Sequence, residues 1–288
     1  MDARGLRGAV SGHCVPPVMF AAEQITRGLL RGEFEPFFQP QVEIGTGHVV
    51  GAEALARWLH PQHGVVAPCA FMRPLLQSGC GDMLTRHMLR KAAAMCRIAR
   101  AAGHDTTIAV NVCLESLADV TFAQQVLSIV RSEGADPHCI VLEVTESVAT
   151  VELGTVPENL AFLRIMGFGL ALDDNGTGSS SLRQLTWIPF AELKIDPSLV
   201  THAARRESTR AMLASSIDLA KKLNLRAVAV GVETREDWDV LRDLKCDVAQ
   251  GYYIARPMSA DAYLDWLGDG PRMRNPGSLR SSSARRVR

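Results

Sequence analysis

The sequence predicts an α/β fold, a modified TIM-type (β/α)8 barrel with one antiparallel strand. Three observations support this fold class. The chain has 288 residues, which suits one barrel of about 250 residues with short extensions. Runs of β-branched residues alternate with segments of helical period. Two extended runs near the start flank a short glycine turn, and this turn predicts the reversed strand.

The first two strands are expected at residues 35–44 and 48–58. They flank Gly45-Thr46-Gly47, whose composition favours a tight reversal. A hairpin joins antiparallel strands, whereas a strand–helix–strand unit joins parallel ones. One strand of the barrel is therefore expected to run against its neighbours.

The later strands are short apolar, β-branched runs that end at glycine or polar residues. They are expected at residues 107–112, 140–144, 169–173, 191–195, 226–230 and 247–252. Between them lie segments with apolar residues at three-to-four spacing, the period of an amphipathic helix. These helices are expected at residues 83–102, 122–133, 156–166, 208–223 and 235–244.

The two ends of the chain differ in composition from the rest. We assign residues 1–18 to a flexible leader, residues 19–269 to the barrel domain and residues 270–288 to a disordered Arg/Ser-rich tail. From Pro271 to Arg288 there are six arginines and no acid, a composition that cannot bury a core. A solvated tail is expected, and the alternative is an electrostatic arm for nucleic acid or an acidic partner.

The overall composition narrows the classes of partner. The 31 Lys and Arg residues balance 31 Asp and Glu residues, so net charge favours no polyanion and no nucleic-acid contact is expected of the barrel. No apolar run approaches the roughly 20 residues that span a bilayer, so a cytoplasmic protein without membrane contact is expected. Seven cysteines without a C-x-x-C pair favour free buried thiols over a zinc site or a disulfide framework.

Polar side chains recur where the predicted strands end. They are Glu53, Asn111, Glu143, Asp173, Asp174, Lys194 and Gln250. Barrels of this class keep their chemistry at the carboxyl ends of the strands, and oxygen ligands suit hard cations such as Mg²⁺ or Mn²⁺. Any one of these acids alone would more often be a helix cap or an ion-pair partner. Their repetition, and the adjacent Asp173 and Asp174, which repel each other unless a cation offsets them, predict a site for one or two divalent ions.

The motifs around these residues resemble those of the EAL-domain family. Glu53-Ala54-Leu55 is the family's name motif, followed by Arg57-Trp58 and preceded by Gln39-Pro40. Further matches follow in the family's order, and they are Val110-Asn111, Glu143-Val144-Thr145-Glu146, Asp173-Asp174, Lys194-Ile195-Asp196, Gly231-Val232-Glu233 and Gln250-Gly251-Tyr252. Each motif alone is weak, but together they are specific and span most of the chain.

The resemblance implies a barrel that binds cyclic di-GMP and, in active members, hydrolyses it to pGpG with the help of Mg²⁺ or Mn²⁺. The implied metal ligands are Glu53, Asn111, Glu143, Asp173 and Asp174. Lys194 and Asp174 are the implied catalytic residues, and Lys194 would orient water or offset phosphate charge. The implied ligand contacts are Gln39, Leu55, Arg57 and Gln250, and Glu146 would brace the loop that couples metal binding to dimerisation.

The chain departs from the family pattern at functional positions. Family members usually have Ala-Glu-Gly-Val-Glu where this chain has Ala229-Val230-Gly231-Val232-Glu233. Val230 thus replaces a glutamate that assists the second metal and the water, and valine can neither ligate a cation nor accept a proton. Asn175 and Ser179 replace two aromatic residues of the dimerisation loop. Weak or lost hydrolysis is therefore expected.

Two functions remain open. The first is a regulatory EAL-domain protein that binds cyclic di-GMP or a protein partner, as do short family members that control virulence or motility genes. The alternative is an active Mg- or Mn-dependent phosphodiesterase that produces pGpG. The resemblance also implies a homodimer, which the altered loop at Asn175 and Ser179 leaves open. Direct DNA contact through the arginine tail has no helix-turn-helix to support it.

Overall fold

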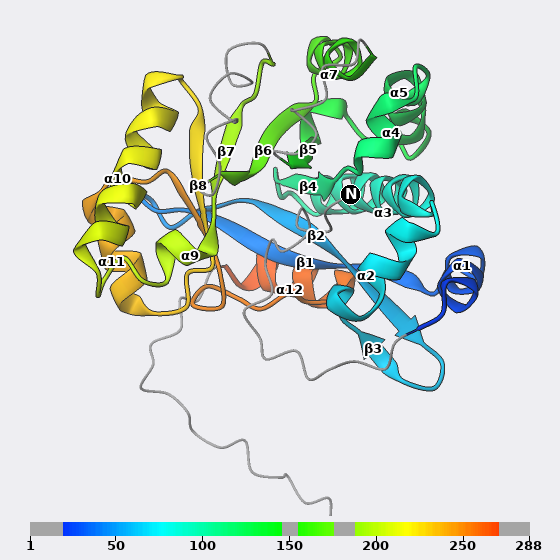
Figure 1. The fold of residues 1–288 in the computed structure, drawn as a ribbon, viewed down its shortest axis with the longest axis horizontal. Helices are drawn as coiled ribbons and strands as arrows, with labels where there is room; N and C mark the ends of the chain where they lie inside the picture. The colour runs from blue at the N-terminus through cyan, green and yellow to red at the C-terminus, as the bar shows by residue number, and fades with distance from the viewer. Residues whose placement is uncertain (1–19, 146–154, 176–187, 271–288) are drawn as a thin grey trace, which may run out of the picture.

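The computed structural model describes residues 20–145, 155–175 and 188–270. Within these ranges eight strands close a barrel, and a ninth strand extends it at one side (Figure 1). In ring order the eight are β1 (Phe34–Glu43), β9 (Val248–Gln250), β8 (Arg226–Val230), β7 (Glu192–Ile195), β6 (Gly169–Asn175), β5 (Ile140–Thr145), β4 (Thr107–Asn111) and β2 (Val49–His60). Strand β3 (Gly64–Val66) pairs with β2 outside the ring.

One strand of the ring runs against its neighbours. Strand β1 is antiparallel to both β2 and β9, and the other neighbouring strands of the ring are parallel. The turn between β1 and β2 ends at Gly47, whose φ of 75° lies in the left-handed region that glycine adopts without strain. The predicted fold class, an α/β barrel with one antiparallel strand, is confirmed.

The predicted helices all form, and their ends differ from prediction by no more than two residues. They are α3 (Gly81–Ala101), α5 (Phe122–Ser132), α7 (Thr155–Ile165), α10 (Glu207–Lys222) and α11 (Arg235–Asp243). Within the described ranges, strand β3 and six further helices were not predicted from the sequence. These helices are α1 (Ala22–Leu30), α2 (Pro68–Gln77), α4 (Leu114–Ala118), the 3-10 helix η1 (Pro137–Cys139), α9 (Pro197–Val200) and α12 (Ala260–Asp269).

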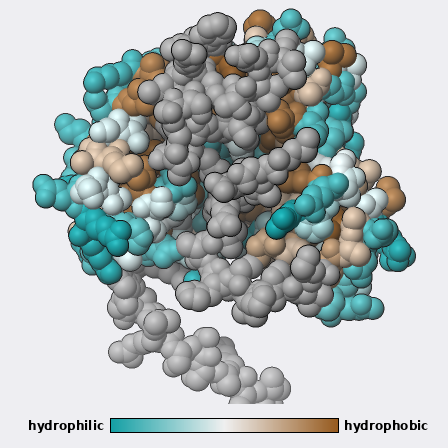
Figure 2. Space-filling model, viewed as in Figure 1, coloured by the Kyte–Doolittle hydropathy of each residue, from teal (hydrophilic) through white to brown (hydrophobic). Residues whose placement is uncertain are grey.

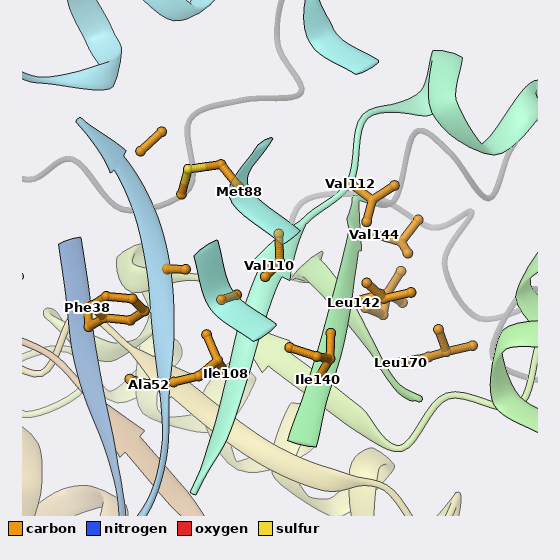
Figure 3. Packing of buried hydrophobic residues seen from close by; sticks show 14 of the residues in the cluster. Phe38, Ala52, Met88, Ile108, Val110, Val112, Ile140, Leu142, Val144 and Leu170 are labelled. Atoms are coloured by element: carbon orange, nitrogen blue, oxygen red, sulfur yellow. The ribbon is translucent and has the colours of Figure 1, made fainter. Parts of the chain in front are cut away.

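The strands of the barrel bury two different faces. Successive side chains of a strand point to opposite faces, and the even-numbered residues of β4 to β6, such as Ile108, Leu142 and Leu170, belong to the main core together with Met88 of α3. Figure 3 shows these side chains along consecutive strands. The odd-numbered residues Ala109, Val141 and Ala171 form a separate small cluster. Odd positions of these strands therefore face the barrel interior.

The outer surface of α11 is polar. On α11, Asp239 pairs with Arg242 at 2.8 Å and with Arg235 at 3.6 Å. Figure 2 shows hydrophilic residues gathered on the left side of the molecule, where α10 and α11 lie in Figure 1. Among the described residues, no helix combines the length and the apolar character needed to cross a membrane.

The cysteines follow the prediction with one exception. Cys80, Cys96, Cys139 and Cys246 are free and buried, and Cys113 is free and half-buried. The expectation of free thiols is wrong for Cys69, which is disulfide-bonded. A disulfide depends on two Cβ atoms coming within about 4.5 Å, and spacing along the sequence does not determine that approach.

Candidate functional site

Six of the seven predicted polar residues lie on the inner face of the barrel, at the end where the parallel strands finish, which we call the barrel mouth. The side chain of the seventh, Asp174, falls outside the described part of the chain. Asn111 and Gln250 are the last residues of β4 and β9, while Glu143, Asp173 and Lys194 lie on β5, β6 and β7. Glu53 lies on β2, one residue before the last pair that β2 forms with β4. The strand alternation thus brings residues from six strands to one place.

Lys194 lies at the centre of the described carboxylates. Its Nζ is 2.7 Å from Oε2 of Glu143, 3.2 Å from Oε2 of Glu53 and 3.5 Å from Oδ1 of Asp173. The side chains of Lys194 and Glu53 are each 3% exposed, and that of Glu143 is fully buried. A single ammonium group therefore neutralises part of the charge of three carboxylates that water barely reaches.

Two amides complete the hydrogen bonds of Glu53. Asn111 Nδ2 donates to Oε1 at 2.9 Å, and Gln250 Nε2 donates to Oε2 at 2.7 Å. Burial raises the pKa of Glu53, but Lys194, Gln250 and Asn111 together outweigh it, so the pKa lies below its ordinary value. Glu53 is consequently held as a carboxylate.

The partners of Glu53 titrate differently. Burial raises the pKa of Glu143 well above its ordinary value, and the charges of Glu53 and Asp173 add to this rise against the opposing charge of Lys194. Burial lowers the pKa of Lys194, but Asp173, Glu143 and Glu53 outweigh it and hold that pKa well above its ordinary value. Lys194 is therefore cationic near neutral pH, and Glu143 is the acid whose charge the site tolerates least.

The donor set fits a hard divalent cation. It offers carboxylate oxygens from Glu53, Glu143 and Asp173 and an amide oxygen from Asn111, and Mg²⁺ and Mn²⁺ prefer such ligands. Oε1 of Glu143 is buried and has no hydrogen-bond partner among the described residues. Three carboxylates and one ammonium sum to a formal charge of −2 (−3 + 1). Within the described ranges, however, no three acid, histidine or cysteine side chains stand in a ready-made metal geometry, and the Lys194 ammonium lies among the candidate ligands.

The four residues expected to contact a ligand lie on three strands: Leu55 and Arg57 on β2, Gln39 on β1 and Gln250 on β9. Leu55 and Arg57 follow Glu53 at alternate positions, and both are half-buried. The Arg57 guanidinium lies over the ring of Phe37, with 5.7 Å between Cζ and the ring centroid, and its Nη1 donates to the Ala56 carbonyl at 3.0 Å. Gln39 is buried and accepts from Gln250 at 3.1 Å. The guanidinium is thus fixed at the edge of the mouth.

Val230 occupies the end of β8 beside Gln250, its partner in the β8–β9 register. The side chain is buried, with 6% of the residue exposed, yet Val230 belongs to neither of the two hydrophobic clusters. The next residue, Gly231, turns the chain away with a φ of 85°. An apolar side chain therefore lies at a position of the mouth where the neighbouring strands carry polar groups.

Two predicted residues cannot be compared with the structure. Asp174 belongs to β6 by its backbone, but its side chain falls outside the described part of the chain, and so does Glu146. The same holds for Ser179 and for the side chain of Asn175. The expected roles of Asp174 as ligand and catalyst and of Glu146 as a brace for the loop stay predictions.

The structure adds one residue that was not predicted from the sequence. Gln41 is 5% exposed and donates from Nε2 to Oε1 of Gln250 at 2.9 Å. Its spacing of two from Gln39 places both glutamines on the same face of β1. That spacing is a signal from which Gln41 could have been identified.

Comparison with known proteins gives a consistent picture. Residues 22–257 match the family described as the EAL domain. The chain is 35% identical over 242 residues to cyclic di-GMP phosphodiesterase RocR of Pseudomonas aeruginosa, covering 84% of this chain and 62% of that protein. It is 34% identical over 241 residues to the bifunctional diguanylate cyclase/cyclic di-GMP phosphodiesterase MucR of the same species, covering 83% of this chain and 35% of that protein. The chain spans less than two thirds of the length of both relatives.

Solved structures agree with the sequence match. The P. aeruginosa MucR phosphodiesterase in complex with c-di-GMP superposes with a TM-score of 0.79 at 33% identity, covering 84% of this chain and 98% of that chain. The EAL enzyme Bd1971, bound to cAMP and cyclic di-GMP, superposes with a TM-score of 0.81 at 27% identity, covering 85% of this chain and 68% of that chain. Since the family match runs across the whole ring of strands and includes the residues of the mouth, this chain belongs to the EAL-domain family.

Proposed function

We propose that this chain is a regulatory EAL-domain protein that binds cyclic di-GMP at the barrel mouth and hydrolyses it weakly or not at all. The observation that carries the proposal is the contrast within one site. Glu53, Asn111, Glu143, Asp173 and Lys194 form a connected network in which all but the half-buried Asn111 are buried, while Val230 brings no polar atom to its strand end. The relatives RocR and MucR are named for action on the same dinucleotide, which supports the choice of ligand.

Several groups would serve ligand binding. Arg57 lies near the mouth with its guanidinium ordered on Phe37, so it is positioned for a charge-assisted contact with a phosphate. Glu53, Asn111, Glu143 and Asp173 would hold the divalent ion, and Lys194 would balance the remaining negative charge. When bound, such ions polarise a phosphodiester and assist attack by water. The described site thus supplies the groups that would hold the cation and the phosphate.

Val230 bears on the hydrolytic step. A side chain that moves a proton in the transition state contributes about 10²–10⁴-fold to a rate, and valine cannot do so. Two carboxylates of the site, Glu53 and Asp173, pair with Lys194, and neither belongs to β8, whose last residue is Val230. We therefore assign slow or absent turnover to the loss of a carboxylate at position 230, and we treat binding as the retained function.

The alternative is an active phosphodiesterase that releases pGpG. It is favoured by the retained carboxylates and by the 35% identity to RocR, a phosphodiesterase by name. Under this alternative, Lys194 and Asp174 would carry the chemistry without a glutamate at position 230. The two functions differ in their response to a single substitution.

The test compares the unmodified chain with Val230→Glu and with Val230→Gln, which has the same size without the charge. Turnover of cyclic di-GMP to pGpG is measured with Mg²⁺ and with Mn²⁺ by separating the two nucleotides. We expect Val230→Glu to raise the rate at least 100-fold and Val230→Gln to leave it low. Brisk turnover by the unmodified chain, equal to that of Val230→Glu, would refute impaired catalysis and support the active enzyme. Turnover that is equally low in both chains would refute the assignment of the loss to position 230.

Binding is tested separately by calorimetry with cyclic di-GMP and Ca²⁺. We expect a single site that Arg57→Ala weakens, because the phosphate contact is lost. Arg90→Ala, which removes a half-exposed arginine of α3, serves as the control and should bind as the unmodified chain does. Failure of the unmodified chain to bind would leave a protein partner as the remaining regulatory ligand. The homodimer and the control of virulence or motility genes stay predictions.

A further inference from the structure

Gln41 occupies a particular place in the barrel. In the register of β1 it faces Gly51 of β2 on one side and Gln250 of β9 on the other. It therefore lies where the first and last strands of the ring meet. A register irregularity follows immediately, between Gln41 and Val42, and such bulges often redirect a side chain.

Hydrogen bonds link Gln41 to Glu53 through Gln250, and each residue of this chain donates to the next. Gln41 Nε2 donates to Gln250 Oε1 at 2.9 Å, and Gln250 Nε2 donates to Glu53 Oε2 at 2.7 Å. A carboxylate accepts hydrogen bonds only, so Glu53 requires the NH₂ end of the Gln250 amide. The NH₂ end also donates to Gln39 of β1 at 3.1 Å, and the oxygen end is left to accept from Gln41 of the same strand. Gln41 thus fixes the oxygen end of Gln250 in the orientation that Glu53 needs.

Space for this arrangement comes from Gly51. A Cβ at position 51 would lie 3.2 Å from Oε1 of Gln41 and 2.8 Å from the carbonyl oxygen of Thr107. The backbone of β4 cannot yield easily, so a larger residue would push against the Gln41 amide. The absence of a side chain at Gly51 therefore leaves the space that the buried Gln41 amide occupies.

We propose that Gln41 is a positioning residue for the ligand site and acts through Gln250. Its amide fixes Gln250, and Gln250 in turn fixes the carboxylate of Glu53 in the set expected to hold the cation and, through it, the dinucleotide. This inference rests on the proposed binding function. Residues that orient a metal ligand typically change affinity about 10–100-fold when they are lost, and we expect a change of that size here.

The experiment is a double-mutant cycle on the full chain. Gln41→Met and Gln250→Met keep the length of the side chain and remove the amide, and Gln125→Met on α5 is the exposed control. The dissociation constant for cyclic di-GMP is measured by calorimetry with Ca²⁺, and the melting temperature of each variant is recorded. We expect Gln41→Met to weaken binding about 10–100-fold, and the double variant to bind no more weakly than Gln250→Met alone.

The outcomes separate the two proposals. If the unmodified chain binds but Gln41→Met binds within twofold of it, the positioning role is refuted and the binding function stands. If the losses of the two single variants multiply in the double variant, Gln41 acts independently of Gln250 and the inference is also wrong. If the unmodified chain binds no cyclic di-GMP, the proposed function fails and takes this role with it. A purely structural Gln41 would lower the melting temperature without the non-additive loss of affinity.

Discussion

Lys194 offers the most direct test of the electrostatics at the barrel mouth. Its ammonium lies within 3.5 Å of an oxygen atom of each of three carboxylates, with its side chain 3% exposed. The substitution Lys194→Met keeps the length of the side chain and removes the charge. Glu53, Glu143 and Asp173 are then left near one another without that cation.

The magnitude follows from the cost of an unpaired buried charge. Removing one partner of a buried ion pair typically costs about 3–5 kcal/mol. For a domain of this size each kcal/mol corresponds to a shift of about 2–4 °C in melting temperature. We expect Lys194→Met to melt about 6–20 °C below the unmodified chain in buffer that contains a chelator.

A divalent ion should reverse part of this loss. A ligand that binds the folded state alone adds about 2.7 kcal/mol when its free concentration is 100 times its dissociation constant. Mn²⁺ should therefore restore a larger share of stability to Lys194→Met than it adds to the unmodified chain, because the variant carries one more uncompensated negative charge. Differential scanning calorimetry with Mn²⁺ and with chelator measures both effects.

Lys222 provides the matched control. Its side chain is 72% exposed and pairs with Asp218 at 2.7 Å on the surface of α10, where such pairs contribute little. Lys222→Met should melt close to the unmodified chain, with and without Mn²⁺. A melting temperature for Lys194→Met no lower than that of Lys222→Met would refute the reasoning about charge at the mouth.

Three further predictions concern the frame of the site. Gly51→Ala should lower the free energy of unfolding by about 1–3 kcal/mol in urea, because the added methyl overpacks the barrel interior, whereas Gly45→Ala, with nothing within 4 Å of an added Cβ, should have little effect. The raised pKa of Glu143 means that the folded state loses stability as pH rises above the ordinary value of 4.5 toward that pKa. Urea unfolding of metal-free Glu143→Gln should lose this dependence on pH, and an unchanged slope would contradict the assignment. Thr234→Ala removes the N-cap of α11, whose hydroxyl accepts from the Asp237 backbone at 3.1 Å, and should cost about 1 kcal/mol by the same measure.

The sequence predicted the long amphipathic helices and the strands of the barrel ring. The amphipathic pattern placed α10 and α11 within one residue at each end, and apolar runs placed the strands. Helices α1 and α12 were missed although they are amphipathic, and other missed helices are too short for such a pattern or contain proline. Helix α9 has four residues, α4 has five, and α2 contains Pro74 inside the helix. Neither the spacing of apolar residues nor helix propensity therefore predicted these helices.

The sequence predicted most residues of the site but not the contacts between them. The family motifs identified Glu53, Glu143 and Lys194, which the barrel brings into contact. The strand-end pattern placed Lys194 in the same set as the candidate ligands, but its contacts with three carboxylates depend on how the strands stagger, which no motif indicated. Gln41 was missed because its partner Gln250 is 209 residues away in the sequence.

The meeting of β1 and β9 also has a consequence for how the protein assembles. The Gln41–Gln250 hydrogen bond closes the ring between the first and the last strand of the barrel, and contacts of such high sequence separation form slowly in folding. A chain that has built only β1 to β8 has not yet acquired Gln250, so Glu53 lacks one of its two amide donors. The mouth is therefore complete only after β9 has paired with β1. A ligand that needs the complete mouth would bind only a domain whose barrel has closed.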